Sequence, residues 1–142
     1  MARIGQEIGQ SAVVTVTQDQ IAGFAAVTDD AQAIHLDPQA ARAAGFGGPV
    51  AHGFLTLSLL SAFAYDAVPR VTGQSASLNY GFDRVRFIAP VQAGAEIAAQ
   101  FVLEDAEERP DGGLMLVLDV TVAEPGSDVP VLRALWRILI LF

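Results

Sequence analysis

The sequence predicts an α+β fold in which an antiparallel β-sheet wraps around one long, buried central helix. Residues 54–65 (FLTLSLLSAFAY) are apolar on nearly every side, which is typical of a helix inside a protein. After Pro69 the sequence changes to four or five segments of strand character joined by turns, a succession that favours antiparallel pairing. We expect the 142 residues to form a single domain, residues 1–142, because this length suffices for one buried core.

The composition is that of a globular protein, with 52% hydrophobic and 17% charged residues. All 8 basic residues are arginine, and 16 acidic residues give a formal net charge of −8, which disfavours nucleic-acid binding. The lack of cysteine excludes disulfides and thiolate metal sites. No apolar run approaches the roughly 20 residues of a membrane helix, and residues 1–10 lack the apolar segment of a signal peptide. We therefore expect a cytoplasmic protein that spans no membrane.

The N-terminal part of the chain predicts a strand followed by a helix. Residues 11–17 (SAVVTVT) alternate β-branched and polar positions and predict the strand. Thr17 and Gln20 then form a T-x-x-Q capping box, which predicts the start of the helix. This helix ends near residues 28–30, and its predicted core-facing side carries Ile21, Phe24 and Ala25.

A second helix is expected over residues 38–44. Asp37 supplies its N-cap, Pro38 occupies the first helical position, and Gly45 follows the last turn. The loop over residues 45–49 (GFGGP) either turns tightly or brings the backbone close to a neighbour.

The C-terminal half predicts the sheet. Its predicted strands cover residues 75–80, 84–88, 96–104, 114–123 and 129–142. Residues 81–83 (GFD) separate the first two as a bend or a bulge. Residues 109–113 (RPDGG) are a hairpin signal between the third and fourth.

Asp30 and His35 are the first pair with catalytic potential, because they lie four residues apart in a loop between two predicted helices. A carboxylate near an imidazole can hold a water molecule and take its proton, which is general acid–base chemistry. The ordinary alternative is that Asp30 caps a turn and His35 is a loop histidine. A D-x4-H spacing by itself favours that alternative, since histidine has many uses.

Gly53 stands at the start of the predicted central helix, where backbone N–H groups have no partner within the helix. An unhindered N–H at this place can hold a developing oxyanion, whereas the plain alternative is a glycine that permits close packing. We interpret His52 as a packing and hydrogen-bonding residue that fixes the loop before Gly53.

Asp30, His35, Asp37 and His52 together offer two carboxylates and two imidazoles, which is one type of metal-ligand set. The chain has no H-E-x-x-H pattern or similar helical pairing, so we predict no metal site. Elsewhere, Arg84 and Arg86 lie two apart on a predicted strand and share a face. This face either contacts phosphates or is an ordinary solvated surface.

Three segments together resemble the MaoC-like hydratases, the family of (R)-specific enoyl-CoA hydratases with the hot dog fold. Residues 30–35 (DAQAIH) look like the family's D-x4-H catalytic motif, and residues 51–58 (AHGFLTLS) look like the start of its central helix. Residues 79–87 (NYGFDRVRF) resemble the nodulation-protein-N-like branch of the family, together with Pro90, Val91 and Gly94. The resemblance extends over residues 5–125.

The resemblance implies a reaction in fatty acid metabolism. A trans-2-enoyl thioester binds with its carbonyl oxygen on the Gly53 N–H, Asp30 acts as base on a water that His35 orients, and an (R)-3-hydroxyacyl thioester forms reversibly. The acyl group arrives on coenzyme A or acyl-carrier protein, and no cofactor is required. Gln32 stands where many members have Asn followed by Pro, which leaves the loop less rigid. The implied substrate-binding residues are Gln32, His52, Phe54, Ser58, Ser61, Asn79, Arg84 and Arg86.

A homodimer and an acyl-binding region are also expected. Two hot dog sheets typically join into one, and a lone sheet beside this apolar helix would leave an apolar edge or face in water. Phe54, Ser58 and Ser61 share one side of the helix, which we expect to set the accepted acyl length. Two alternatives remain open, an acyl-CoA thioesterase of the hot dog type and a non-catalytic acyl-thioester-binding subunit. Release of free thiol identifies a thioesterase, whereas loss of the enoyl group without thiol release identifies a hydratase.

Overall fold

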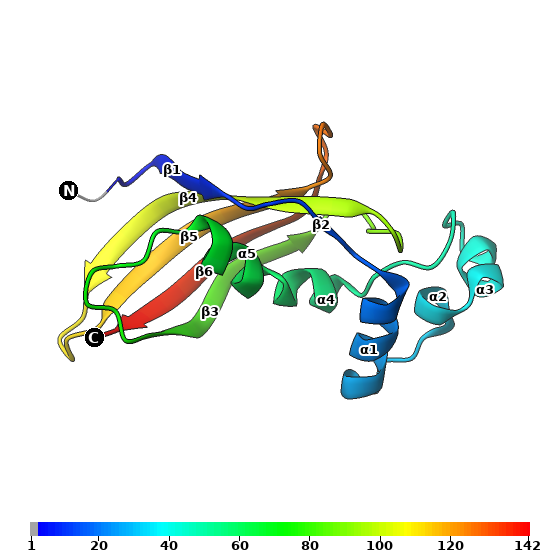
Figure 1. The fold of residues 1–142 in the computed structure, drawn as a ribbon, viewed down its shortest axis with the longest axis horizontal. Coiled ribbons are helices and arrows are strands. Elements are labelled where there is room, and N and C mark those ends of the chain that lie inside the picture. The colour runs from blue at the N-terminus through cyan, green and yellow to red at the C-terminus, as the bar shows by residue number, and fades with distance from the viewer. Residues whose placement is uncertain (1–2) are drawn as a thin grey trace.

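The computed structural model describes residues 3–142 as a six-stranded sheet with one helical segment lying across a single face (Figure 1). The strand order is β1-β4-β5-β6-β3, all neighbours are antiparallel, and β2 also pairs with β4. This arrangement confirms the predicted α+β architecture and places β3 at one edge. The strands are β1 (Gln6–Gln10), β2 (Val14–Thr15), β3 (Ala76–Phe87), β4 (Glu96–Glu108), β5 (Leu114–Ala123) and β6 (Pro130–Leu141).

The helices occupy two places. Figure 1 shows α4 and α5 crossing the sheet, and α1, α2 and α3 grouped beyond one end of it. Their bounds are α1 (Gln18–Thr28), α2 (Ala33–Leu36), α3 (Pro38–Ala43), α4 (Gly53–Ser58) and α5 (Leu60–Ala67). The chain therefore passes from the end group into the sheet-covering helix at residues 44–52, just before α4.

The predicted helix starts are confirmed. The Thr17 hydroxyl accepts a hydrogen bond from the Gln20 N–H, and the Gln20 side chain accepts one from the Thr17 N–H, which completes the capping box. Asp37 caps α3 by accepting from the Gln39 N–H at 2.8 Å, with Pro38 as the first helical residue. Gly45 has a φ of +94°, a value that suits glycine at the end of this helix.

The central helix is buried on one side only. Leu55, Leu60 and Phe63 lie in the core against the sheet, whereas the side chains of Phe54 and Tyr65 are 64% and 79% exposed. The expectation of burial all round is therefore wrong for the single chain, because no other element of residues 3–142 covers the far side. The helical hydrogen bonding continues between α4 and α5, since the Leu59 N–H donates to the Leu55 carbonyl at 3.1 Å.

The first strand differs from the prediction over residues 11–17. The longer pairing segment is β1, and only Val14–Thr15 of the predicted range forms a strand. The ladder is interrupted at Ala12, whose N–H donates to the Asp66 carboxylate at 2.6 Å instead of to a neighbouring strand. The alternating pattern could not show this side-chain contact, because Asp66 is 54 residues away.

The other strands follow the prediction, with β4 extended to Glu108 and β6 slightly shorter than predicted, at Pro130–Leu141. β3 is one strand and not two, and its register shifts at Asn79/Gly81 and at Phe82/Arg84, which confirms a bulged region near residues 81–83. β5 coincides with the predicted residues 114–123. The hairpin before it is closed by a hydrogen bond from the Arg109 N–H to the Gly113 carbonyl.

The two faces of the sheet have different partners. Alternate residues of β6 join the core with the helix, and Trp136 among them is only 3% exposed. Arg137, its neighbour in sequence, points to the opposite face and forms an ion pair with Asp83 at 2.8 Å. Within residues 3–142, no helix is long and apolar enough to cross a membrane.

Candidate active site

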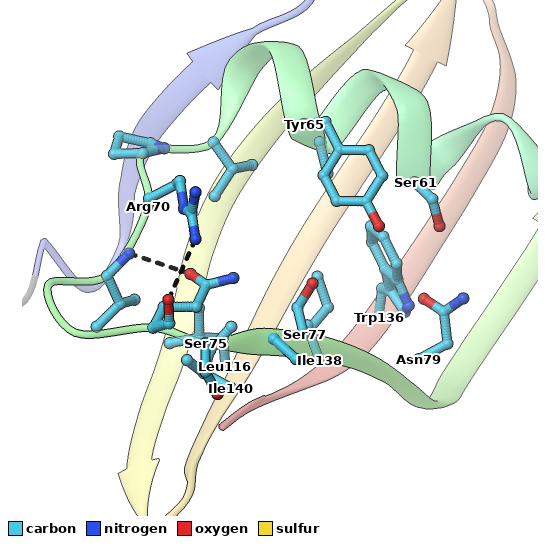
Figure 2. A pocket seen from close by; sticks show the side chains of 16 residues that line it. Ser61, Tyr65, Arg70, Ser75, Ser77, Asn79, Leu116, Trp136, Ile138 and Ile140 are labelled. Carbon is cyan, nitrogen blue, oxygen red and sulfur yellow. Dashed lines mark hydrogen bonds between the residues drawn. The ribbon is translucent and has the colours of Figure 1, made fainter. Parts of the chain in front are cut away.

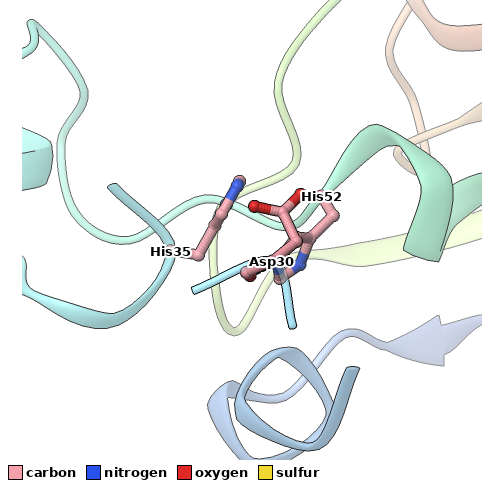
Figure 3. A group of neighbouring side chains, drawn as sticks. All are labelled: Asp30, His35 and His52. Atoms are coloured by element: carbon pink, nitrogen blue, oxygen red, sulfur yellow. Dashed lines mark hydrogen bonds between the residues drawn. The ribbon is translucent and has the colours of Figure 1, made fainter. Parts of the chain in front are cut away.

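Asp30, His35 and His52 lie together where the end group of helices meets the start of α4. One potential ligand atom from each side chain lies within 4.8 Å of the others. Figure 3 shows the Asp30 carboxylate directed into the space beside the two imidazole rings. Residues from three successive segments of the chain therefore form one compact polar cluster, in which both imidazoles are buried.

His35 lies on α2, a single-turn helix in a segment for which the sequence predicted a loop. Its ring Nδ1 lies 2.6 Å from the Val50 carbonyl oxygen. A carbonyl oxygen can only accept a hydrogen bond, so Nδ1 carries the proton, and Nε2 of the neutral ring keeps a lone pair. The backbone carbonyl of His35 also accepts from the Gln18 side chain at 2.9 Å, which ties α2 to α1.

The backbone that orients His35 is itself fixed from two directions. The Val50 N–H donates to the Ile34 carbonyl at 3.1 Å, and the Ala51 N–H donates to the Val91 carbonyl at 2.7 Å. The segment before His52 therefore cannot slide relative to α2 without losing hydrogen bonds on both sides. This pairing explains how a residue from the loop after α3 sets the tautomer of His35.

His52 contacts both members of the predicted catalytic pair. Its Nε2 lies 2.8 Å from the backbone carbonyl oxygen of Asp30, so Nε2 carries the proton. Its ring stacks on that of His35, with centroids 3.7 Å apart and planes inclined by 25°. It is 2% exposed, and Phe24 packs against it from α1. His52 thus supports the Asp30 backbone and the His35 ring at the same time.

Asp30 follows the end of α1, where Asp29 adopts a left-handed conformation with φ 57°. That turn directs the chain back toward the two histidines. The Asp30 side chain is half-buried, and its carboxylate oxygens accept no hydrogen bond from the described residues 3–142. The free acceptors of the cluster are therefore the Asp30 carboxylate, the His35 Nε2 and the buried His52 Nδ1.

Gly53 is the first residue of α4 and follows His52 directly. A Cβ at Gly53 would lie 2.9 Å from Cδ1 of Phe87, so close packing does require glycine here. The Gly53 N–H has no acceptor within residues 3–142, so both interpretations of this residue remain compatible with its position. A cavity of about 280 Å³ opens beside it, lined also by Thr56 and Phe46.

The donor geometry bears on the metal alternative. An imidazole binds a metal ion near its own ring plane, at a distance of about 2.1 Å. Because the rings of His35 and His52 are stacked, an ion in the plane of one ring would lie well outside the plane of the other. Asp37, the fourth proposed ligand, is engaged as the cap of α3 and does not belong to the cluster. The residues present therefore fit a metal poorly.

The other predicted binding residues are distributed over several places. Ser61 and Asn79 line a second cavity, between α5 and β3. Phe54 and Ser58 lie on the exposed side of the helix, where the Ser58 hydroxyl donates to the Phe54 carbonyl at 2.7 Å. Gln32 is exposed and contributes its backbone carbonyl, which accepts from the His35 N–H at 3.1 Å.

Arg84 and Arg86 do share a face of β3, as expected. Their partners across the ladder are Leu135 and Arg133, whereas the intervening Val85 packs against the core. Both arginines are therefore exposed on the face opposite to the helix. Contact with a phosphate group stays a prediction for these two residues.

Three contributors were not found from the sequence. Val50 acts through a backbone carbonyl, which has no signature in the sequence. Gln18 acts through a side chain that reaches another helix. Trp136 lines the second cavity, and its place as the single tryptophan on the inner side of an alternating strand was an available signal.

Comparisons with known proteins agree on one family. The sequence model of the family described as "MaoC like domain" matches residues 1–123. "Nodulation protein N" of Rhizobium leguminosarum bv. viciae is 45% identical over 142 residues, which cover 99% of this chain and 88% of that protein. "3-hydroxyacyl-thioester dehydratase Z" of Mycobacterium tuberculosis (strain ATCC 25618 / H37Rv) is 40% identical over 129 residues, or 91% of this chain and 85% of that protein.

A third relative comes from Aeromonas caviae. Its "(R)-specific enoyl-CoA hydratase" is 33% identical over 96 residues, which cover 66% of this chain and 68% of that protein. The solved structure of an (R)-hydratase from A. caviae has a TM-score of 0.76 at 23% identity and covers 96% of both chains. This likeness confirms the predicted hot dog fold.

Proposed function

The chain belongs to the MaoC-like domain family, and from this premise we propose that it adds water reversibly to a trans-2-enoyl thioester. The relatives named as a hydratase and a dehydratase support a hydro-lyase. The observation that carries the proposal is the pair of free acceptors at the site, the Asp30 carboxylate and the His35 Nε2. A water molecule has two hydrogens, so these two acceptors can hold it and leave an oxygen lone pair for the substrate.

The proposed step adds the elements of water across one double bond. Asp30 takes a proton as the water oxygen forms a bond to the β-carbon, and the π electrons move toward the thioester carbonyl. The negative charge that develops on the carbonyl oxygen is received by the Gly53 N–H. A proton is then delivered to the α-carbon with help from His35, which restores the Asp30 carboxylate and gives the 3-hydroxyacyl thioester. The (R) configuration is proposed from the name of the A. caviae relative.

The carrier of the acyl group is coenzyme A or an acyl-carrier protein, and the chain itself supplies all the acid–base groups. Gln32, beside the pair, and Arg84 and Arg86, on the outer face of β3, are proposed to contact the carrier or the substrate. For the two arginines to do so, the substrate must extend past the edge strand. We propose that a second copy of the chain completes this region.

The homodimer is supported by the edge strand β3. Exposed apolar side chains on and next to it include those of Leu78, Tyr80, Phe87 and Ile88, and an unpaired apolar edge favours strand pairing with another chain. The exposed Phe54 and Tyr65 on the helix add apolar surface that a second copy would cover. Sedimentation at micromolar protein concentration is expected to give a dimer, and a monodisperse monomer would contradict it.

Turnover of crotonyl-CoA tests the proposed function. The wild-type protein is expected to remove the enoyl absorbance without releasing free thiol, and the product is expected to be the (R)-3-hydroxy thioester by chiral analysis. Release of free thiol would instead identify a thioesterase. Absence of both changes with crotonyl-CoA and with the corresponding acyl-carrier-protein substrate would indicate a non-catalytic subunit and overturn the proposal.

A further inference from the structure

The cavity beside Gly53 has an apolar wall that carries one polar side chain. It has a volume of about 280 Å³ and is bordered by the start of α4, the loop before it and the residues that follow β3. Its apolar lining includes Phe46, Phe87 and Val91. Thr56 is the one residue of the lining with a polar side chain, so its hydroxyl is the group that gives this cavity a hydrogen-bonding preference.

The Thr56 hydroxyl has no partner in the protein, yet a ligand can reach it. Thr56 is only 4% exposed, and its hydroxyl makes no hydrogen bond within residues 3–142. The unpaired side-chain polar atoms that these residues seal from solvent are His52 Nδ1 and Trp136 Nε1. The Thr56 hydroxyl is therefore unpaired but not sealed. Thr56 lines the cavity beside Gly53 and not the second cavity, so a ligand reaches the hydroxyl from the Gly53 side.

A neighbouring hydroxyl on the same helix shows what Thr56 lacks. Ser58 donates to the Phe54 carbonyl, one turn back along the helix, at 2.7 Å. The corresponding carbonyl for Thr56 is that of His52, which accepts instead from the backbone N–H groups of Leu55 and Thr56 at 3.0 and 3.3 Å. A buried hydroxyl without a partner is energetically costly, so a ligand that supplies one gains affinity.

We propose that the cavity beside Gly53 receives the pantetheine arm of the thioester, and that the Thr56 hydroxyl forms a hydrogen bond with the first amide group of this arm. The inference rests on the proposed function, which places the thioester carbonyl at the Gly53 N–H. Coenzyme A and acyl-carrier protein share this arm, so the contact is the same for either carrier. A hydroxyl donates and accepts, so it can pair with the C=O or the N–H of the amide.

The spacing along the helix fits this assignment. Thr56 lies three residues after Gly53, which corresponds to about 4.5 Å at the helical rise per residue. In the pantetheine arm, a two-carbon link separates the thioester sulfur from the first amide, so the amide lies within reach of the next helical turn when the carbonyl is at Gly53. The apolar wall then contacts the methylene groups of the link.

The acyl chain leaves the thioester on the other side of its carbonyl, and the second cavity remains for it. That cavity has a volume of about 570 Å³ and lies between α5, the loop that follows it, and strand β3. Figure 2 shows Ser61 and Tyr65 entering it from the helix, opposite Ser77 and Asn79 on the strand side. The two ends of the thioester therefore each have a cavity along the same helix.

The decisive comparison uses two crotonyl thioesters that differ only in the amide. The N-acetylcysteamine thioester carries the first amide of the arm, and the S-pentyl thioester replaces this amide with two methylene groups. The ratio of their kcat/KM values is measured within each protein, so the folded fraction cancels. Thr56→Val removes the hydroxyl and should lower the ratio of amide to alkyl substrate about 5-fold relative to the wild type. Thr56→Ser is the control, because it keeps the hydroxyl and should keep the wild-type ratio.

Binding of saturated thioesters gives a second measurement that needs no turnover. In calorimetric titrations, Thr56→Val should raise the Kd about 5-fold for both butyryl-CoA and hexanoyl-CoA, because the two ligands carry the same arm. A factor that changes with the acyl chain would assign the cavity to the acyl group and overturn the inference.

The outcomes separate this inference from the proposed function. An unchanged ratio or unchanged Kd values in Thr56→Val would overturn the inference, even if crotonyl-CoA is hydrated. A Thr56→Ser variant that behaves like Thr56→Val would also overturn it, because the hydroxyl would then not be the group that matters. If no enoyl thioester is turned over, the proposed function fails, and equally weakened binding of both saturated thioesters by Thr56→Val would still support the pantetheine site. Absence of binding to the wild type would overturn both proposals.

Discussion

The two ends of the α4–α5 helix use polar groups in opposite ways. At the N-terminal end, both histidine rings donate to backbone carbonyls, His35 to Val50 and His52 to Asp30. Along α5, the Trp136 N–H beneath the helix has no acceptor within residues 3–142. The first arrangement fixes the direction of reactive lone pairs before substrate arrives, which is the preorganisation that acid–base catalysis needs. The second leaves a buried donor unpaired, which is energetically costly.

The difference teaches that exposure alone does not identify functional groups. His35, His52 and Trp136 are all buried, at 7%, 2% and 3% exposure. What separates them is which atoms are already bonded to the protein. A substitution in the cluster at the start of α4 should therefore affect kcat for every substrate. A substitution in the cavity along α5 should affect only the choice among longer substrates.

The largest effect is expected for Asp30 and His35. Asp30→Asn keeps the side-chain shape but removes the carboxylate, and His35→Ala removes the second acceptor for water. Each change should lower kcat for crotonyl-CoA by about 10²- to 10⁴-fold. The double variant should be little worse than the poorer single variant, because the two groups act on one water molecule. Multiplicative losses in the double variant would show that they act independently.

The same assay includes a chelator. The wild-type rate is expected to be unchanged, because in the proposed mechanism the Asp30 carboxylate and the His35 Nε2 hold a water molecule and no metal ion. Loss of activity with the chelator and recovery with a divalent ion would revive the metal alternative. Turnover at the wild-type level by Asp30→Asn would remove the hydratase mechanism.

His52 provides the next largest effect. His52→Phe keeps a ring to stack on His35 but loses the donor to the Asp30 carbonyl, and His52→Gln keeps a donor but loses the ring. Each should lower kcat by roughly 10- to 100-fold with little change in KM, because small misplacements of catalytic groups are costly. If either variant retains the full wild-type kcat, the contact that it lacks is not needed for positioning.

Gly53→Ala tests whether close packing against Phe87 requires glycine at this position. The added Cβ would press on the Phe87 ring, and such overpacking destabilises a protein by about 1–3 kcal/mol. Thermal unfolding should show a lower Tm than for the matched control Gly48→Ala, since a Cβ at Gly48 meets nothing within 4 Å. Equal Tm values for the two variants would show that the Phe87 ring moves aside without cost.

Ser61 distinguishes the cavity from the exposed side of the helix. Ser61→Leu fills the space opposite Trp136 and should lower kcat/KM for a decenoyl thioester by about 10-fold relative to crotonyl-CoA. Ser58→Leu is the control and should leave the ratio of the decenoyl to the crotonyl kcat/KM at the wild-type value. Ser58 lies on the exposed side of the helix, where its hydroxyl donates to the Phe54 carbonyl. A ratio that changes equally in both variants would place the acyl chain elsewhere.

The smallest effect on stability is expected for the ion pair on the sheet face opposite to the helix. This pair lies outside both the catalytic cluster and the second cavity. Arg137 lowers the pKa of Asp83 by its hydrogen bond and its charge. A carboxyl with a lowered pKa in the folded state stabilises the fold above its ordinary range and loses this contribution as pH falls through the folded-state value. Asp83→Asn should therefore lower Tm slightly at neutral pH, and the difference from the wild type should shrink below about pH 4. A difference that grows toward acid would contradict the pairing.

Local signals in the sequence were reliable where neighbouring residues decide the structure. The capping box at Thr17 and Gln20, the Asp37-Pro38 helix start and the hairpin before β5 all depend on contacts within a few residues, and all three are present. The alternating and helical patterns were sufficient for the α+β architecture. The resemblance of residues 30–35 and 51–58 indicated the family, which the comparisons then showed.

Longer-range contacts decided the rest. The sequence placed Asp30, His35 and His52 in one stretch, but only the folded chain stacks the histidines and assigns their protons through the carbonyls of Val50 and Asp30. The apolar composition of the central helix could not distinguish burial by its own sheet from an exposed side left for a partner. Trp136 reached the cavity near Ser61 and Asn79 because β6 and β3 pair over residues that are far apart in the chain. Hydrophobic patterns determine which faces are buried, whereas the atom that a buried polar group meets depends on the whole tertiary structure.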